Sequence, residues 1–204
     1  MNLFKTIHKQ DHLTQIIYIN ILVFIIIHIF GIIYFFSGLG TNLESQLILL
    51  NNLSVSSNIN TLIYKPWTII THMFVHVDLL HALINLCYLY FGGKILTSYL
   101  NNKNVLYIYM MGGITGALLY ILSFNTFPVF EDIKTHSMAF GASASALAVL
   151  FATATYVPNF PVNVIFFKDV KLKYIVMIII IISILSIPHN NAGGHIAHIG
   201  GAFY

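Results

Sequence analysis

The chain has 204 residues, of which 58% are hydrophobic and only 7% are charged, whereas about a quarter of the residues in an ordinary soluble domain are charged. This composition excludes a soluble domain and indicates an integral membrane protein. The net charge of +3 comes from nine basic residues, all lysines, which are spread along the chain and form no basic patch, so nucleic acid is not an expected partner. The single cysteine, Cys87, excludes a disulfide framework and a cysteine-based metal site.

Apolar segments of about 20 residues, the length that crosses the hydrocarbon core as a helix, recur along the chain. They predict an all-α, polytopic membrane protein: a single membrane domain over 1–204, built as a bundle of six transmembrane helices. Residues 1–14 precede the first span, and the polar segment after it is too long for a tight turn, which predicts a structured interfacial loop. The sixth span is expected to be truncated at Tyr204, about half the length needed. The predicted spans are about 15–38, 79–100, 105–124, 139–157, 173–187 and 192–204.

The lysines predict the orientation, because cytoplasmic loops carry an excess of Lys and Arg. With the N-terminus in the cytoplasm, only Lys65 and Lys134 fall on the outer side. The Lys-, Asn- and Ile-rich, arginine-free composition is typical of an AT-rich, bacterial genome. We therefore expect a multi-pass protein of the bacterial cell (inner) membrane.

Glycines in the third span predict close helix packing. The segment "GGITG" brings Gly112, Gly113 and Gly116 together, and small residues at this spacing let helix backbones approach closely within a membrane. Gly92 and Gly93 are expected to serve the same purpose in the second span.

Polar side chains at membrane depth are costly and mark functional candidates. His81 and Asn85 share one face of the second span, Ser143 lies at the outer end of the fourth, and His198 lies in the first turns of the sixth. All are predicted at a similar depth near the outer side, although they are distant in sequence. These residues belong to three sets of polar side chains in the sequence: His72, His76, His81 and Asn85; Ser143 and Ser145; and His189, His195 and His198.

A serine beside a histidine can be a nucleophile with its general base, and a histidine and an asparagine from a third helix can stabilise an oxyanion. No Asp or Glu lies in the spans at this depth, so a Ser–His dyad is expected. Ser143 and Ser145 lie roughly 200° apart around a helix, so only one of them can face His198. Ser145 is then expected to point to a neighbouring helix or to its own backbone.

Three segments together carry a resemblance to a known family. "HMFVHVDLLHALINLCYLYFGG" at 72–93, "GASA" at 141–144 and "AHIGG" at 197–201 resemble the second-span, nucleophile and histidine motifs of the rhomboid intramembrane serine proteases, in the right order. The resemblance implies that Ser143 is the nucleophile and His198 the general base. It implies that His81 and Asn85, with the backbone N–H of Ser143, are the oxyanion donors. It further implies an active site toward the outer side, no cofactor, and transmembrane segments of other proteins as substrates.

Two other functions remain open. His72 with His76 and His195 with His198 have spacings that can share a metal, which describes a histidine-ligated membrane metalloenzyme, although the glutamate of a His-Glu-x-x-His motif is missing. A catalytically inactive relative that binds membrane helices is the other alternative. His72 and His76 are otherwise expected to anchor their loop through hydrogen bonds.

Overall fold

The computed structural model describes residues 11–164, 167–189 and 191–204, so most of the predicted N-terminal segment 1–14 lies outside the described residues. The described chain is predominantly helical. Its helices are α2 (His12–Phe36), α3 (Asn42–Leu53), α4 (Ile59–Tyr64), α5 (Thr68–Thr71), η1 (His72–Phe74), α6 (Leu79–Leu96), α7 (Asn102–Thr126), η2 (Pro128–Phe130), α8 (Ser143–Tyr156), α9 (Leu172–Ser186) and α10 (Ala192–Phe203). Its strands are β1 (Val55–Ser56), β2 (Met138–Ala139), β3 (Pro161–Val164) and β4 (Phe167–Lys171).

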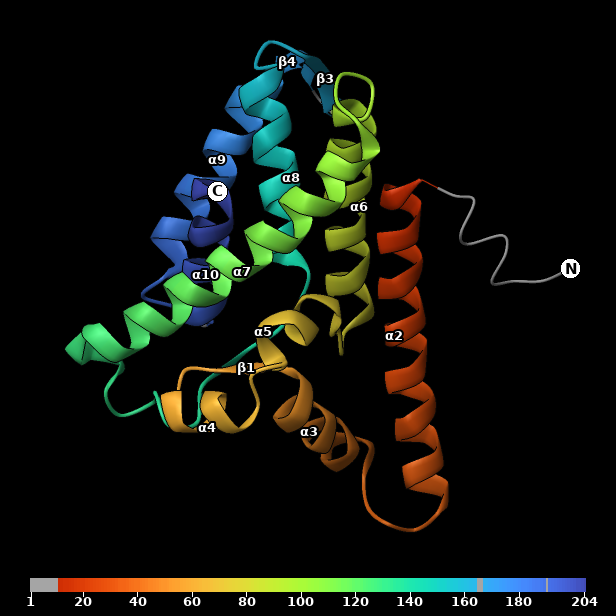
Figure 1. Cartoon of the computed structure of the whole chain (residues 1–204), viewed down its shortest axis with the longest axis vertical. Helices are drawn as coiled ribbons and strands as arrows, with labels where there is room; N and C mark the ends of the chain where they lie inside the picture. The colour runs from red at the N-terminus through yellow and green to blue at the C-terminus, as the bar shows by residue number, and fades with distance from the viewer. Residues whose placement is uncertain (1–10, 165–166, 190) are drawn as a thin grey trace, which may run out of the picture.

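Within the described residues, three helices are long and apolar enough to cross a membrane: α2, α6 and α7. The helices α8 and α9 are apolar but shorter, with 14 and 15 residues. At 1.5 Å per residue α8 is about 21 Å long. In Figure 1 successive long helices run in alternating directions between the two ends of the bundle.

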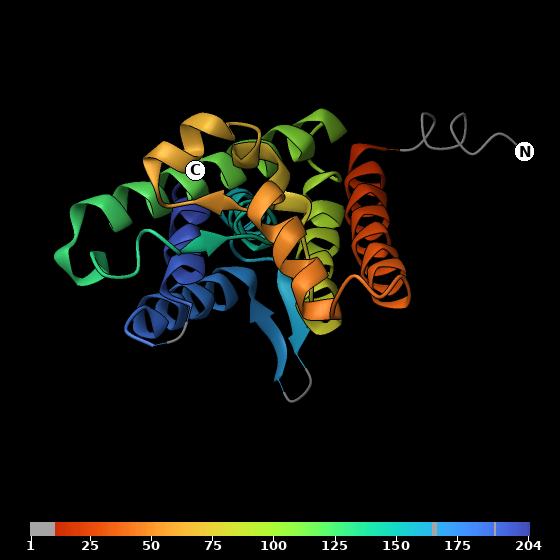
Figure 2. The same cartoon turned by 90° about the horizontal axis from the view of Figure 1, so that it is seen from below.

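The short helix α8 is the centre of the bundle. It packs against α6, α7, α9 and α10, and Figure 2 shows it nearly end-on among them. Its small residues, including buried Ala144, Ala146 and Ala148, allow these neighbours to approach closely. A methyl group on Gly112 would collide with Ala148, and one on Gly116 would meet the Ala144 side chain and the Ala197 backbone, which confirms the packing role predicted for "GGITG".

The segment between α2 and α6 is structured, as expected for an interfacial loop. Helix α3 begins with a reciprocal cap, in which Thr41 and Glu44 each bond the other's backbone N–H. After α3, strand β1 pairs antiparallel with β2, which directly precedes α8. The Ser57 hydroxyl donates to the Lys134 carbonyl at 2.5 Å and fastens this ladder to the loop after α7.

The opposite end of the bundle carries a feature that the apolar pattern did not predict. Strands β3 and β4 form an antiparallel hairpin between α8 and α9, and Figure 1 places it at the end away from α3 and α4. Pro158 lies just after the end of α8 and Pro161 is the first residue of β3, in keeping with the tendency of proline to end a helix.

A buried polar chain ties the loop before α6 to the bundle. The Tyr109 hydroxyl donates to the Met73 carbonyl at 2.8 Å and accepts from the Asn20 amide at 3.1 Å. Tyr109 and Asn20 are at most 1% exposed. Because unpaired polar groups are costly in an apolar interior, these bonds fix η1 between α2 and α7, and η1 leads into the candidate site.

Candidate active site

Ser143 is the first residue of α8, so the helix begins four residues later than the sequence indicated. The delay has a local cause, because Met138 and Ala139 are held in the β1–β2 ladder and the chain then turns at Gly141. The Gly141 N–H donates to the His72 carbonyl at 2.9 Å. Ser143 is thereby held at a helix N-terminus, where backbone N–H groups lack partners within the helix.

Gly141 brings the segment that carries Ser143 against α6. Its φ is +118°, a conformation that is strained for any residue other than glycine. A Cβ atom there would lie 2.9 Å from Cε1 of His81. Glycine is therefore required at this position for two separate reasons.

His81 and Asn85 lie one turn apart near the start of α6. Asp78 caps this helix by accepting from the His81 backbone N–H at 2.7 Å, which sets where the helix begins. Asn85 is 2% exposed, and its amide nitrogen lies 3.0 Å from Nε2 of His76. One amide hydrogen is used in this bond, and Asn85 lines the same pocket as Ser143.

His76 joins the two halves of the site. Its Nε2 accepts both from the Asn85 amide and from the backbone N–H of Ala142, the latter at 3.2 Å. A nitrogen that accepts two hydrogen bonds carries no proton, and burial lowers the pKa of His76 to about 4, so the ring is neutral. His76 and His72, which bonds the Thr68 carbonyl at 3.0 Å, thus anchor their loop as expected.

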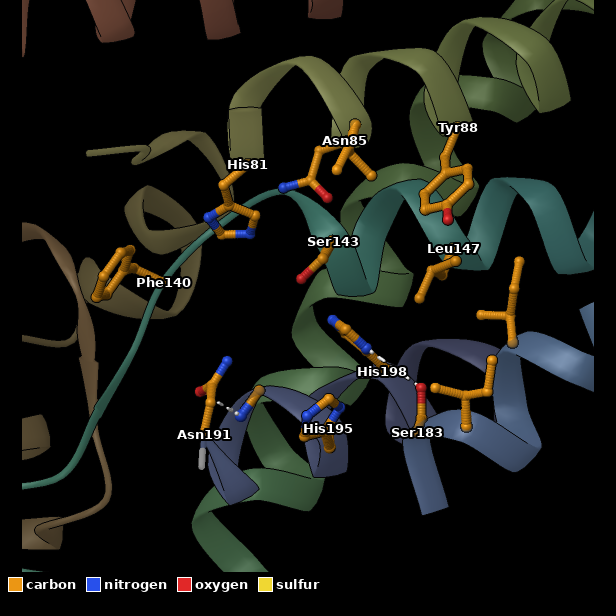
Figure 3. A pocket seen from close by; sticks show the side chains of 14 residues that line it. His81, Asn85, Tyr88, Phe140, Ser143, Leu147, Ser183, Asn191, His195 and His198 are labelled. Carbon is orange, nitrogen blue, oxygen red and sulfur yellow. Dashed lines mark hydrogen bonds between the residues drawn. The ribbon is translucent and has the colours of Figure 1, made fainter. Parts of the chain in front are cut away.

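His198 reaches the site from α10. This helix is capped by the Asn191 side chain, which accepts from the Gly194 N–H at 3.2 Å. His198 Nδ1 lies 3.4 Å from the hydroxyl of Ser183 on α9, and Figure 3 shows the imidazole between Ser183 and Ser143. Ser183 was not identified from the sequence, where its only signal is a hydroxyl within an isoleucine run.

One pocket of about 340 Å³ unites the four residues singled out from the sequence, Ser143, His198, His81 and Asn85. They come from α8, α10 and α6 and face the same space (Figure 3). Within the described residues, the Ser143 hydroxyl makes no hydrogen bond. Such contacts are often loose before substrate binds. The rest of the lining is Ile84, Tyr88, Phe140, Leu147, Ile179, Ile182, Ser183, Asn191, Gly194 and His195.

Comparison with known families agrees with this geometry. The Rhomboid domain family matches residues 64–204, which is most of the chain and includes the whole pocket. This chain belongs to the rhomboid family. No curated protein matches it significantly. Rhomboids are a family of intramembrane proteases that also has inactive members. Family membership and the apolar helices together identify this rhomboid as an integral membrane protein.

Other candidates lie elsewhere in this rhomboid. Ser145 is fully buried, and among the residues that the structure describes its hydroxyl has no hydrogen-bond partner. It lies against Gly113 of α7, as helix geometry predicted. Among the described residues, no group of three or more His, Cys, Asp or Glu side chains is arranged to hold a metal ion. His72 and His76 are committed to the hydrogen bonds described above.

Proposed function

We propose that this rhomboid is an intramembrane serine endopeptidase that cleaves transmembrane segments of other membrane proteins. The observation that carries the proposal is the single pocket lined by Ser143, His198, His81 and Asn85. A nucleophile, a base and two oxyanion donors, drawn from three helices, are the groups that acyl transfer requires.

The reaction follows from the roles of these groups. The Ser143 hydroxyl attacks a peptide carbonyl while His198 Nε2 takes its proton, and the carbonyl oxygen becomes an oxyanion. Collapse of this intermediate breaks the C–N bond, and His198 returns the proton to the leaving amine. Water then attacks the acyl-enzyme with the same assistance and releases the acid and Ser143.

Three donors are proposed to stabilise the oxyanion. His81 and the second amide hydrogen of Asn85 supply two from α6. The Ser143 backbone N–H supplies the third, since it belongs to the unpaired first turn of α8, where the helix dipole is positive. Such preorganised donors typically contribute about two to three orders of magnitude each to the rate.

The proposal includes a membrane arrangement. The six predicted spans correspond to α2, α6, α7, α8, α9 and α10, in one domain with the N-terminus in the cytoplasm of a bacterium and the pocket toward the outer side. Unwinding of the substrate helix exposes its carbonyls, which a hydrogen-bonded helix hides. We therefore expect helix-breaking residues near the cleavage point.

Cleavage of a reporter transmembrane helix in proteoliposomes tests the function. Ser143→Ala and His198→Ala are expected to remove measurable cleavage, because dyad members act as a unit. Ser145→Ala is the matched control and should retain cleavage within about twofold, since its hydroxyl has no partner and helix serines are usually structural. Cleavage that survives Ser143→Ala, or a wild type that binds the helix without cutting it, contradicts the proposal.

A further inference from the structure

Ser183 is the one polar residue within the aliphatic stretch 178–185 of α9. Its neighbours Ile181, Ile182, Ile184 and Leu185 are about half exposed or more, whereas Ser183 is 4% exposed. Its side chain faces the pocket and the ring of His198 (Figure 3). This placement differs from that of a hydroxyl that only fills a helix interface.

The hydrogen bond of Ser183 is also unusual for this chain. Thr115, Thr153 and Thr155, all within helices, donate to a carbonyl of the preceding turn at 2.7–3.0 Å, which is the common habit of helical hydroxyls. The hydroxyl of Ser183 instead meets Nδ1 of His198, at 3.4 Å. Within the described residues, no other group bonds the imidazole of His198.

We propose that Ser183 is a positioning residue for His198, which makes the catalytic unit Ser143–His198–Ser183. This rests on the proposed function. The Ser183 oxygen accepts from Nδ1–H of His198, and that bond selects the tautomer whose Nε2 lone pair is free to take the proton of Ser143. A third group that fixes the tautomer of the base performs this task in a serine–histidine–aspartate triad.

A hydroxyl suits this position better than a carboxylate. The pocket that Ser183 faces is also lined by the aliphatic side chains of Ile179, Ile182 and Leu147. An ionised carboxylate there would lose its hydration among aliphatic side chains, which is costly, whereas a hydroxyl needs only one partner. The hydroxyl still orients the ring.

The length of the contact indicates when it acts. At 3.4 Å it is longer than a strong hydrogen bond. When His198 takes the proton of Ser143 it becomes a cation, and hydrogen bonds from a charged donor are shorter and stronger. An interaction that strengthens in the transition state raises kcat and leaves KM almost unchanged.

The test compares three substitutions at one position. Ser183→Thr keeps the hydroxyl, Ser183→Val has nearly the same volume as threonine without it, and Ser183→Ala removes it with less volume. Ser186→Ala, three residues on in the same helix and outside the pocket lining, is the control. Two rates are measured in proteoliposomes: cleavage of the reporter helix, and labelling of Ser143 by a fluorophosphonate, which needs an activated serine but no peptide substrate.

We expect Ser183→Ala and Ser183→Val to lower both kcat and the labelling rate about tenfold, the factor that corresponds to one such hydrogen bond, with KM unchanged. Ser183→Thr should stay within about twofold of the wild type, and Ser186→Ala should match it. Labelling of Ser183→Ala at the wild-type rate overturns the proposal, as does a threonine variant as slow as valine. Failure of the proposed function looks different, because the wild type itself would then neither cleave nor label at Ser143.

Discussion

Gly141 adopts a φ of +118° two residues before Ser143, and its α-carbon faces the ring of His81. Two demands therefore meet at this residue. One is conformational, because side chains are strained at this φ. The other is steric, because the edge of His81 occupies the place of a methyl group. Gly38 shows the first demand alone, with a φ of +69° and no atom within 4 Å of an added Cβ.

Alanine substitutions at Gly141 and Gly38 separate the effect of backbone strain from displacement of the proposed oxyanion donors. We expect Gly141→Ala and Gly38→Ala each to lower the free energy of unfolding by about 1–3 kcal/mol, through backbone strain. Only Gly141→Ala should also reduce kcat, by about a hundredfold, since a misplacement of 1 Å has that effect. Thermal unfolding in detergent and reporter cleavage measure the two quantities. Equal loss of cleavage in both variants would show that strain alone is responsible.

For single residues, the sequence predicts those site residues that are recognised by their spacing from a residue a few positions away in the chain. His81 with Asn85 is visible as a four-residue step, and Ser143 as a serine two residues after a glycine. His76 and Ser183 act through partners distant in sequence, namely Ala142 for His76 and His198 for Ser183. No periodicity reveals such pairs, because they depend on how the loop before α6 and the helix α9 are placed in space.

Helix α10 reaches α8 and α7 through glycine contacts. A Cβ atom on Gly201 would collide with the Ala144 carbonyl oxygen, and one on Gly200 would lie 2.8 Å from the Gly116 α-carbon. These are backbone contacts, so no side chain can rotate to relieve them. Since Ala144 follows Ser143 and Gly201 lies three residues after His198, the same contact brings Ser143 and His198, the proposed nucleophile and base, together.

Gly201→Ala is expected to move α10 away from α8 and to lower cleavage about a hundredfold, with a loss of about 1–3 kcal/mol in stability from overpacking. Gly93→Ala in α6 is the comparison, because the atoms nearest its added Cβ belong to the flexible tip of the Leu13 side chain. We expect that variant to keep cleavage within about twofold. Cleavage assays and chemical labelling of Ser143 check the pair; unaltered kinetics in Gly201→Ala would rule out this role for the contact.

Among the elements, the apolar runs indicate where helices lie, and a helix occupies each of the ranges read as a span. The starting point of α8 and the β3–β4 hairpin escape that pattern. Both depend on strand pairing. Strand β2 pairs with β1, some eighty residues earlier in the chain. The hairpin strands β3 and β4 mix polar and apolar residues. Strands this short have too few residues to show an alternation.

The whole molecule has two chemically different ends. The β3–β4 end carries exposed Lys168 and Lys171, while the opposite end carries Lys134, whose ammonium pairs with Glu131 at 2.7 Å. Under the proposed orientation the first end lies in the cytoplasm, because basic residues accumulate there. The only cysteine, Cys87, is exposed on α6, so a cysteine-free background needs a single substitution.

In a Cys87→Ser background, Lys134→Cys should react with a membrane-impermeant maleimide in spheroplasts, and Lys168→Cys only after permeabilisation. Loss of the exposed Lys134–Glu131 pair should change stability by less than about 1 kcal/mol, so the fold is kept. Mass-tag gel shifts report the labelling. The reverse pattern would invert the topology and place the pocket toward the cytoplasm.

The length of α8 sets the depth at which water is needed. A helix of 14 residues is about 21 Å long, and the hydrocarbon core is about 30 Å thick. If its inner end meets the inner boundary of the core, Ser143 lies roughly 9 Å beneath the outer one. Under the proposed function, the shortness of this helix creates a recess for hydrolysis beneath the outer boundary, and a scissile bond is selected by its depth as much as by its sequence.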